Sequence, residues 1–373
     1  MPLHFTTDEL SAWLRLSLEP GLRSDQARLL LGALGLPPSI YAASSSALLR
    51  YLPAPLVAQL RQPPNDTLQQ QIDRTLQWLD HEHHHVLTLA DPAYPPALLD
   101  LHDPPLILYI NGQLSHLQQP ALAIVGARNA TPGGTAIAQD FAHYLAAQGW
   151  LICSGLASGI DQAAHRGALA AGPQGAGTVA ILGTGIDLVY PAAHRQLAHD
   201  IVQHGILLSE FPLGTKALPY HFPKRNRLVA AFSKGVLVVE AARQSGSLIT
   251  AKLATELGRE VFAIPGSIHS PLSRGCHALL RQGAKLVEQA QDILEELAPN
   301  SLNPPLSTLA PDPTLSAAAR QVLTLLDYSP QSVDELQRLW TGSPATLAQS
   351  LLELEMASLV ARLETGNYQR LKN

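Results

Sequence analysis

The sequence predicts an α/β protein built on an extended Rossmann-like, doubly wound and mostly parallel sheet, with a helical domain before the sheet and a winged-helix domain after it. Short apolar, β-branched runs alternate with helix-compatible segments through the middle of the chain. Helical patterns without strand signals precede these runs. After a proline-rich stretch, the last segment has the pattern of three helices followed by a hairpin, which is the winged-helix order.

The composition excludes several classes of protein. The chain has 373 residues, of which 46% are apolar and 15% charged, so we expect two or three folded domains and no extensive disorder. Its two cysteines are too few for a structural zinc site and fit a reducing cytoplasm. The net charge of -5 argues against a general nucleic-acid binder but leaves a local basic patch open. Because neither a membrane-length apolar run nor a signal-peptide pattern occurs, we expect a cytoplasmic protein without membrane contact.

The first domain, expected over residues 1–75, has the pattern of a small bundle of short helices. Thr6 and Glu9 have capping-box spacing before the first helix, and Pro20-Gly21 breaks the chain before the second. The segment LEPGLRSDQARLL is similar to a helix-hairpin-helix or SAM-like unit, in which backbone amides hold a phosphate. Arg23 stands where such a hairpin usually has a second glycine. A plain packing role is therefore the alternative.

The run HEHHH, from His81 to His85, raises the question of a metal site. Consecutive side chains diverge around a helix or a strand, and no carboxylate or cysteine lies at a useful spacing. We therefore expect a solvated helix end here, and neither a metal nor a cofactor.

The second domain, expected over residues 76–297, contains the sheet. Continuous apolar strands joined by helical crossovers indicate parallel strands covered on both faces, with ligands bound at the carboxyl ends of the strands. The expected strands are 85–89, 106–110, 122–126, 150–154, 178–182, 206–210, 235–240, 260–264 and 285–289.

Three of these strands run into glycine-rich turns that suit an anion. They read AIVGARNAT with Arg128, SGLASGID from Ser154 to Asp161, and LGTGID from Leu182 to Asp187. Glycines let backbone amides approach a phosphate where a helix begins, and a parallel sheet brings all three turns to one edge. The G-x-G-x-x-G of a dinucleotide fold is missing. Ordinary strand-to-helix connections are the alternative for each turn taken alone.

Asp161 and His165 are four residues apart on one helix face. They could form an acid/base pair. The alternative is structural, with Asp161 capping the helix or orienting Arg128 and with His165 supporting it.

A basic and aromatic segment runs from Phe211 to Ala230 and contains no acidic residue. Tyr220, His221 and Phe222 stand directly before Lys224, Arg225 and Arg227, and Lys216 lies upstream. Flat faces for base stacking beside guanidinium groups for phosphates are what single-stranded nucleic acid requires. A solvated basic helix start is the alternative, as is a core position for Phe222. Ser245-Gly246-Ser247, between a strand and a helix, supplies further donors.

The third domain is expected over residues 314–373, after a proline- and serine-rich linker at 298–313. Ser332 and Glu335 have capping-box spacing, and Ser343-Pro344 opens the third helix. That helix contains neither Lys nor Arg, which a groove-reading helix needs to face phosphates. We therefore expect this domain to be dispensable for binding single strands.

The motifs AIVGARNAT, SGLASGIDQAAHRGAL, AILGTGIDLVYP, LLSEFPLGT, FPKRNRLVA, VVEAARQSGSLITA and AIPGS follow one another in that order. With them, the chain closely resembles the DNA-processing protein A family (DprA, also called Smf). The motifs span Leu122 to about Ala284. The resemblance implies a Rossmann-type domain that binds single-stranded DNA without catalysing a reaction on it and forms a homodimer. It also implies that the protein helps to load the recombinase RecA on incoming DNA during natural transformation.

The resemblance also implies which residues bind DNA. The family motifs G-x-R, S-G-x-A-x-G-I-D, F-P-x-R-N-R and S-G-S match residues 126–128, 154–161, 222–227 and 245–247. The implied single-stranded DNA site is Gly126, Arg128, Ser154, Gly155, Ser158, Gly159, Phe222, Lys224, Arg225, Asn226, Arg227, Ser245, Gly246 and Ser247. Among these, we expect the four cations to form one phosphate-binding surface. Ala127 stands where the family often has Ser, which removes one hydroxyl contact but keeps the backbone amides.

The main rival is an enzyme, a nucleotide phosphoribohydrolase on a related Rossmann-like sheet. Such enzymes depend on a P-G-G-x-G-T-x-x-E signature. Here Pro132-Gly133-Gly134-Thr135 comes too early, lacks the third glycine and is not followed by a glutamate. A purely structural RecA scaffold without DNA contact is a third class, which the basic and aromatic segment disfavours.

Overall fold

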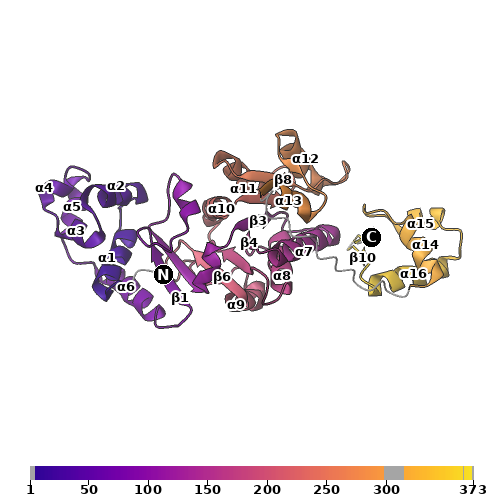
Figure 1. The fold of residues 1–373 in the computed structure, drawn as a ribbon, viewed down its shortest axis with the longest axis horizontal. Helices are drawn as coiled ribbons and strands as arrows, with labels where there is room; N and C mark the ends of the chain where they lie inside the picture. The colour runs from indigo at the N-terminus through magenta and orange to yellow at the C-terminus, as the bar shows by residue number, and fades with distance from the viewer. Residues whose placement is uncertain (1–4, 298–314, 364, 372–373) are drawn as a thin grey trace.

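The computed structural model describes residues 5–297, 315–363 and 365–371. Along the longest axis of the molecule, a helical unit, the sheet domain and the C-terminal unit follow one another (Figure 1). The linker predicted at 298–313 lies outside the described residues. Among the described residues, no helix is both long enough and apolar enough to span a membrane.

The N-terminal unit is a helical bundle, as predicted. The capping box is present, because Thr6 Oγ1 accepts from the Glu9 amide while the Glu9 carboxylate accepts from the Thr6 amide. Its core includes Trp13, Leu14 and Leu30, and it continues onto one face of the sheet. The helices are α1 (Thr7–Leu18), α2 (Ser24–Leu34), α3 (Pro37–Ala42), α4 (Ser45–Leu48), α5 (Ala54–Leu60) and α6 (Asp66–Trp78). The expected boundary at residue 75 therefore falls inside α6.

The histidine run does not end a helix as predicted. Helix α6 ends at Trp78, and His84 already belongs to the first strand. The His84 ring stacks on Trp78 with a centroid separation of 4.1 Å, and His81 stacks on His84 at 4.4 Å. Stacked rings cannot aim their nitrogens at one ion, and no metal-binding group of three or more His, Cys, Asp or Glu occurs in the part of the chain that the structure describes.

The sheet has nine strands, and each lies on one of the nine runs predicted from the sequence. They are β1 (His84–Thr88), β2 (Ile107–Gly112), β3 (Ala121–Val125), β4 (Leu151–Ser154), β5 (Thr178–Ile181), β6 (Gly205–Ser209), β7 (Gly235–Val238), β8 (Glu260–Ala263) and β9 (Lys285–Leu286). Their spatial order is β1-β2-β6-β5-β4-β3-β7-β8-β9. The pairs β1–β2 and β2–β6 are antiparallel and the others are parallel, which confirms a mostly parallel sheet.

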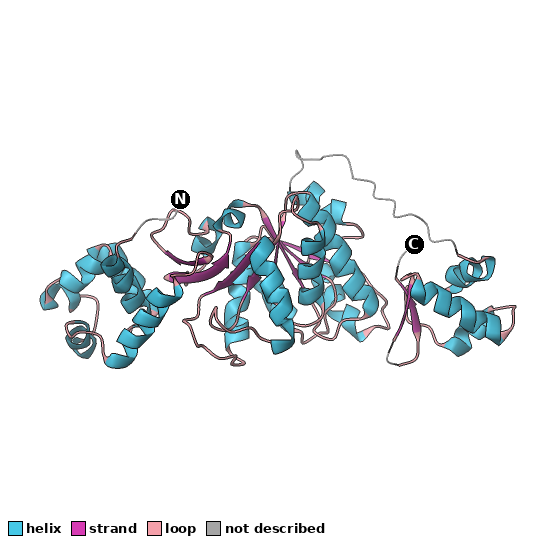
Figure 2. Ribbon diagram, turned by 90° about the horizontal axis from the view of Figure 1, so that it is seen from below, coloured by secondary structure: helices cyan, strands magenta, loops and turns pink. Residues whose placement is uncertain are grey.

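Helices cover both faces of the sheet, which is the doubly wound arrangement (Figure 2). One face packs against α7 (Pro132–Ala147), α8 (Ile160–Ala170), α9 (Arg195–His204) and α13 (Ala290–Leu297). The other packs against α10 (His221–Phe232), α11 (Gly246–Glu256) and α12 (Arg274–Arg281). The chain leaves β3 toward β4, β5 and β6, and later returns to place β7 on the other side of β3. The strand order thus reverses between β3 and β7, where a ligand crevice is expected.

The C-terminal unit has the predicted winged-helix order. It comprises α14 (Ala317–Leu325), α15 (Val333–Leu339), α16 (Pro344–Met356), β10 (Val360–Arg362) and β11 (Tyr368–Arg370). The Ser332–Glu335 capping box opens α15, and Ser343 caps α16. This unit contacts the sheet domain where β11 meets the start of α7, and there the Gly133 amide donates to Gln369 Oε1 at 3.3 Å.

Candidate nucleic-acid interface

A cleft of about 580 Å³ lies at the carboxyl end of β3, where the strand order reverses. The end of β3 forms its floor together with the loop that follows β4, and the first turns of α10 and α11 form its walls. The lining residues are Val125, Gly126, Arg128, Ala157, Asp161, Tyr190, Pro219, Phe222, Pro223, Arg225, Asn226, Ser245, Gly246, Ser247, Ile249 and Thr250. The structure therefore brings together residues of the motifs at 126–128, 154–161, 222–227 and 245–247. The third glycine-rich turn, LGTGID, does not line the cleft, although its Gly183 lies against the Phe222 ring.

Arg128 and Phe222 lie side by side in the cleft. Arg128 is exposed, and its guanidinium carbon lies 5.7 Å from the centroid of the Phe222 ring. On another side, the Tyr190 ring lies 5.6 Å from Phe222 at a tilt of 46°. Phe222 is half-buried and packs its edge near Gly183, where a Cβ would meet the ring at 2.9 Å. The pair thus presents an aromatic face beside an unpaired positive charge.

Arg225 is buried beneath the cleft rather than exposed on a phosphate-binding surface. Its Nη1 donates to the carbonyl oxygens of Gly155 and Ile181, each at 2.5 Å, so it joins the loop after β4 to the end of β5. The same loop also donates two hydrogen bonds to Asp161 Oδ2, from the Gly155 amide at 3.2 Å and from the Ala157 amide at 3.3 Å. Arg225 therefore shapes the cleft, and its predicted phosphate contact is corrected.

Arg227 and Lys224 turn toward a buried carboxylate. Arg227 Nη2 lies 2.5 Å from Glu210 Oε2, and its Nη1 donates to the Asp103 carbonyl at 3.0 Å. Lys224 Nζ lies 3.3 Å from the same Glu210 oxygen, with half of its side chain exposed. The prediction that all four cations form one surface is wrong, since Lys224 and Arg227 both pair with Glu210, Arg227 also pairs with Asp103 at 3.4 Å, and the Arg227 side chain is only 10% exposed. Arg128 is the cation that faces the cleft from its rim.

The turns that follow β3 and β4 supply both residues of the cleft and residues that only pack inside the protein. Gly126 lines the cleft, and Gly159 has a φ of 77° with its Cα packed against the Ala127 and Arg128 carbonyls, a place that only glycine can take. Ser154 is fully buried, and its hydroxyl donates to the Ile124 carbonyl at 2.7 Å. Ser154 is thus a strand-to-strand contact and not a DNA ligand as predicted. Ser158 is exposed next to the cleft.

The Ser245-Gly246-Ser247 turn forms the start of α11 and one cleft wall. Ser245 caps the helix by accepting from the Ser247 amide at 3.3 Å. Asn226 Nδ2 donates across the cleft to the Gly246 carbonyl at 3.4 Å, and its Oδ1 accepts from Arg225 Nε at 3.1 Å. The first turn of α11 carries no acidic residue, so its amides and hydroxyls present a positive end to the cleft.

Asp161 and His165 do not form an acid/base pair. Asp161 accepts hydrogen bonds from the two loop amides described above. The structural alternative that it orients Arg128 has no hydrogen bond or ion pair behind it among the described residues. His165 is fully buried, and its Nδ1 lies 2.7 Å from Thr178 Oγ1. Burial lowers the pKa of His165 to about 3, so the ring is neutral and acts as a core contact.

Comparison with known families assigns the chain to one of them. The family model described as DNA recombination-mediator protein A matches residues 85–298, and the DprA winged helix domain matches residues 306–366. The chain belongs to the DNA recombination-mediator protein A family. Protein Smf of Escherichia coli is 41% identical over 81% of this chain and 81% of its own length. The DNA processing protein DprA of Streptococcus pneumoniae is 44% identical over 56% of this chain and 73% of its own length.

Two solved structures of this family share the fold. An X-ray structure of DNA processing protein A from Streptococcus pneumoniae is 34% identical and covers 79% of this chain and 99% of its own, with a TM-score of 0.64. A structure from Helicobacter pylori, which concerns the single-stranded DNA binding mode of that DNA processing protein A, is 32% identical. It covers 58% of this chain and 96% of its own, with a TM-score of 0.52. The predicted family and fold class are thereby confirmed.

Some cleft residues of this family member were not predicted as site residues. Tyr190 follows the LGTGID turn and is 52% exposed beside Phe222. His221, one of the three flat side chains expected to offer a stacking face, is instead buried against Phe211 at a centroid distance of 4.3 Å. An exposed aromatic shortly after a glycine-rich strand end was the available signal. Glu240 was also missed, and it accepts from the Thr131 hydroxyl at 2.6 Å and from the Thr131 amide at 2.9 Å. It thereby ties the loop that bears Arg128 to the end of β7.

Proposed function

We propose that this protein binds single-stranded DNA in the cleft between α10 and α11, catalyses no reaction on it, and helps to load RecA on that strand during natural transformation. The observation that carries the proposal is the exposed Arg128 guanidinium 5.7 Å from the Phe222 ring centroid, at the carboxyl edge of the sheet. A base stacks on the ring while the guanidinium meets a phosphate.

The chemistry of the cleft suits a strand of any sequence. Its polar groups are backbone amides, hydroxyls and one exposed cation, which recognise a phosphate, and its apolar surface is a ring face, which every base can stack on. With a net charge of -5, the protein needs this local site to hold a polyanion. The site residues proposed to touch DNA are Gly126, Arg128, Phe222 and the 245–247 turn. Ser158 and Lys224 are proposed at its margin.

Relatives support the same function. The names of two relatives call them DNA processing proteins, and the Helicobacter pylori structure concerns single-stranded DNA binding by such a protein. Loading of RecA and assembly as a homodimer come from the family resemblance alone, and we propose both for this chain on that basis.

A phosphoribohydrolase is the weaker candidate. Gly133 and Gly134, in the stretch nearest to that signature, are packed against the Gln369 and Glu240 side chains, so the turn offers no open phosphate cradle. The titratable groups of the cleft floor are committed to structural bonds, as Asp161 is to two backbone amides. These contacts support a binding site without chemistry.

The test is direct binding of fluorescently labelled oligonucleotides, single-stranded and duplex, over a series of salt concentrations. We expect single strands to bind more tightly and Arg128→Ala to reduce the salt slope by about 0.7 for the lost phosphate contact. Lys234→Ala is the matched control, because Lys234 is exposed before β7 begins, at the opposite edge of the sheet. Equal binding of duplex and single strand, or release of free base from nucleoside monophosphates, contradicts the proposal.

A further inference from the structure

Glu240, two residues after the end of β7, holds the loop that bears Arg128. Its Oε1 accepts from the Thr131 hydroxyl at 2.6 Å, and its Oε2 accepts from the Thr131 amide at 2.9 Å. Thr131 Oγ1 in turn accepts from the Gly134 amide at 3.0 Å and caps α7. A Cβ on Gly134 would meet the Glu240 carboxyl group, so only glycine leaves room for it there. The carboxylate therefore joins the loop and the start of α7 to the end of β7.

On the other side of Arg128, the loop is held by a backbone contact. The Ile160 amide, at the start of α8, donates to the carbonyl of Ala127 at 3.1 Å. Arg128 and Asn129 follow Ala127 and are both exposed. The direction of the Arg128 side chain thus depends on two anchors, and the Glu240 carboxylate is the one that a side-chain substitution can remove.

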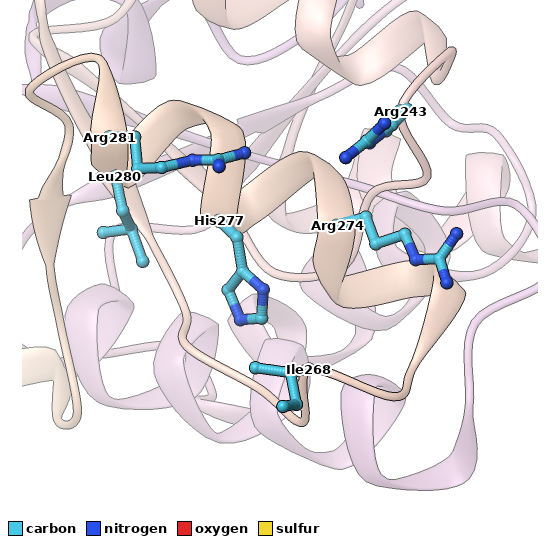
Figure 3. Close-up of a pocket in the computed structure, with 6 residues that line it drawn as sticks. All are labelled: Arg243, Ile268, Arg274, His277, Leu280 and Arg281. Carbon is cyan, nitrogen blue, oxygen red and sulfur yellow. The ribbon is translucent and has the colours of Figure 1, made fainter.

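The backbone that carries Glu240 is itself fixed. The Gly275 amide of α12 donates to the carbonyl of Ala241 at 2.7 Å. Arg243, further along the same segment, lines a hollow together with Arg274 of α12 (Figure 3). Because its backbone is held between β7 and α12, Glu240 can keep the Arg128 loop in one position.

We infer that Glu240 is a positioning residue for DNA binding, which fixes the loop from which Arg128 reaches the strand and touches no DNA itself. The inference rests on the proposed function of the cleft. Glu240 does not line the cleft, and its negative charge by itself would repel a phosphate. The two effects have opposite signs. Removal of the side chain weakens DNA binding if Glu240 positions Arg128, and strengthens it if only the charge of Glu240 matters.

The test is a double-mutant cycle of Glu240→Ala and Arg128→Ala on the full-length protein, with a labelled oligothymidylate of about 16 nucleotides. We expect Glu240→Ala alone to weaken binding by about 5- to 20-fold and to lower the salt slope by up to about 0.7, the value for one phosphate contact. In the Arg128→Ala background, Glu240→Ala should change affinity by no more than about twofold, because the side chain through which it acts is gone.

Substitutions of Thr131 give a second arm that keeps Glu240 in place. Thr131→Val removes the hydroxyl bond and leaves the amide bond, so it should weaken binding by a smaller factor, and only while Arg128 is present. Thr131→Ser keeps both bonds and should bind as the wild type does. Glu256→Ala is the charge-matched control, because Glu256 is an exposed acidic residue of α11 that does not line the cleft. It should leave affinity unchanged.

The inference is overturned if Glu240→Ala binds as tightly as the wild type or more tightly. It is also overturned if Glu240→Ala weakens binding equally with and without Arg128, since a general loss of structure has that result. If the wild type binds no DNA, or if Arg128→Ala binds it as the wild type does, the proposed function fails and the inference fails with it.

Discussion

The two arginines of the cleft have opposite environments, so replacing each with alanine should have opposite effects. Arg225 is 4% exposed and donates to two buried carbonyl oxygens, whereas Arg128 is exposed and makes no hydrogen bond that holds the fold. We expect Arg225→Ala to destabilise the protein and Arg128→Ala to leave its stability unchanged while weakening DNA binding.

The expected loss of stability follows from the buried groups that Arg225→Ala leaves without a partner. The carbonyls of Gly155 and Ile181 lose their donor, and the buried carboxylate of Asp161 loses the positive charge that favours its ionised form. Removing one member of a buried charged arrangement costs about 3 to 5 kcal/mol. For a domain of about 220 residues, this corresponds to a fall in Tm of roughly 6 to 20 °C. Arg128→Ala should change stability by less than about 0.5 kcal/mol.

The assay is thermal unfolding followed by circular dichroism, run on both variants beside oligonucleotide binding. If Arg225→Ala keeps the wild-type Tm and instead reduces the salt slope of binding, Arg225 contacts phosphate and the structural role is refuted. If Arg128→Ala lowers Tm by several degrees, the claim that Arg128 does not stabilise the fold is refuted as well.

Three further predictions concern the ring, the buried histidine and the tail. Phe222→Ala should weaken binding of single strands by about 5- to 150-fold, the range for one lost base stack of about 1 to 3 kcal/mol, with Tm nearly unchanged and Phe222→Tyr as the control. A lower Tm with unchanged affinity would instead place the ring in the core. For His165, burial lowers the pKa from 6.5 to about 3, so only the unfolded chain takes up a proton between these values, and stability that is present above pH 6.5 is lost as the pH falls. The free energy of unfolding should fall by about 2 kcal/mol more in the wild type than in His165→Asn between pH 7 and pH 5, measured by urea denaturation, and parallel curves would contradict this. Truncation after residue 310 should leave single-strand affinity within about twofold, because α16 carries no cation. A tenfold loss with assembly unaltered would show that the winged helix binds DNA.

The secondary structure was largely predictable, because its signals are local. Each strand of the sheet is a short apolar run bounded by glycine, proline or a helix cap, and each was found at its expected place. The Thr6–Glu9 and Ser332–Glu335 capping boxes depend on residues only three positions apart, and both are formed. The convergence of the glycine-rich turns followed from the parallel order of the strands.

The roles of the cations were not predictable in the same way. Lys224, Arg225 and Arg227 lie in one basic run, yet one is half-exposed and two are buried. Their environments depend on Glu210 and on two backbone carbonyls, none of which the run itself specifies. Tyr190 joins Phe222 only because the loop after β5 folds back over the start of α10.

By itself, the sequence determined the fold class, the family and the edge of the sheet at which the cleft opens, since these depend on periodicity, caps and the order of motifs. Only the tertiary structure decided which cation faces solvent. Arg227 meets Glu210 across 17 residues of chain, and Arg225 meets the Gly155 carbonyl across 70. A charge is exposed or neutralised by partners that packing brings to it, and no pattern within a few residues of the charge encodes those partners.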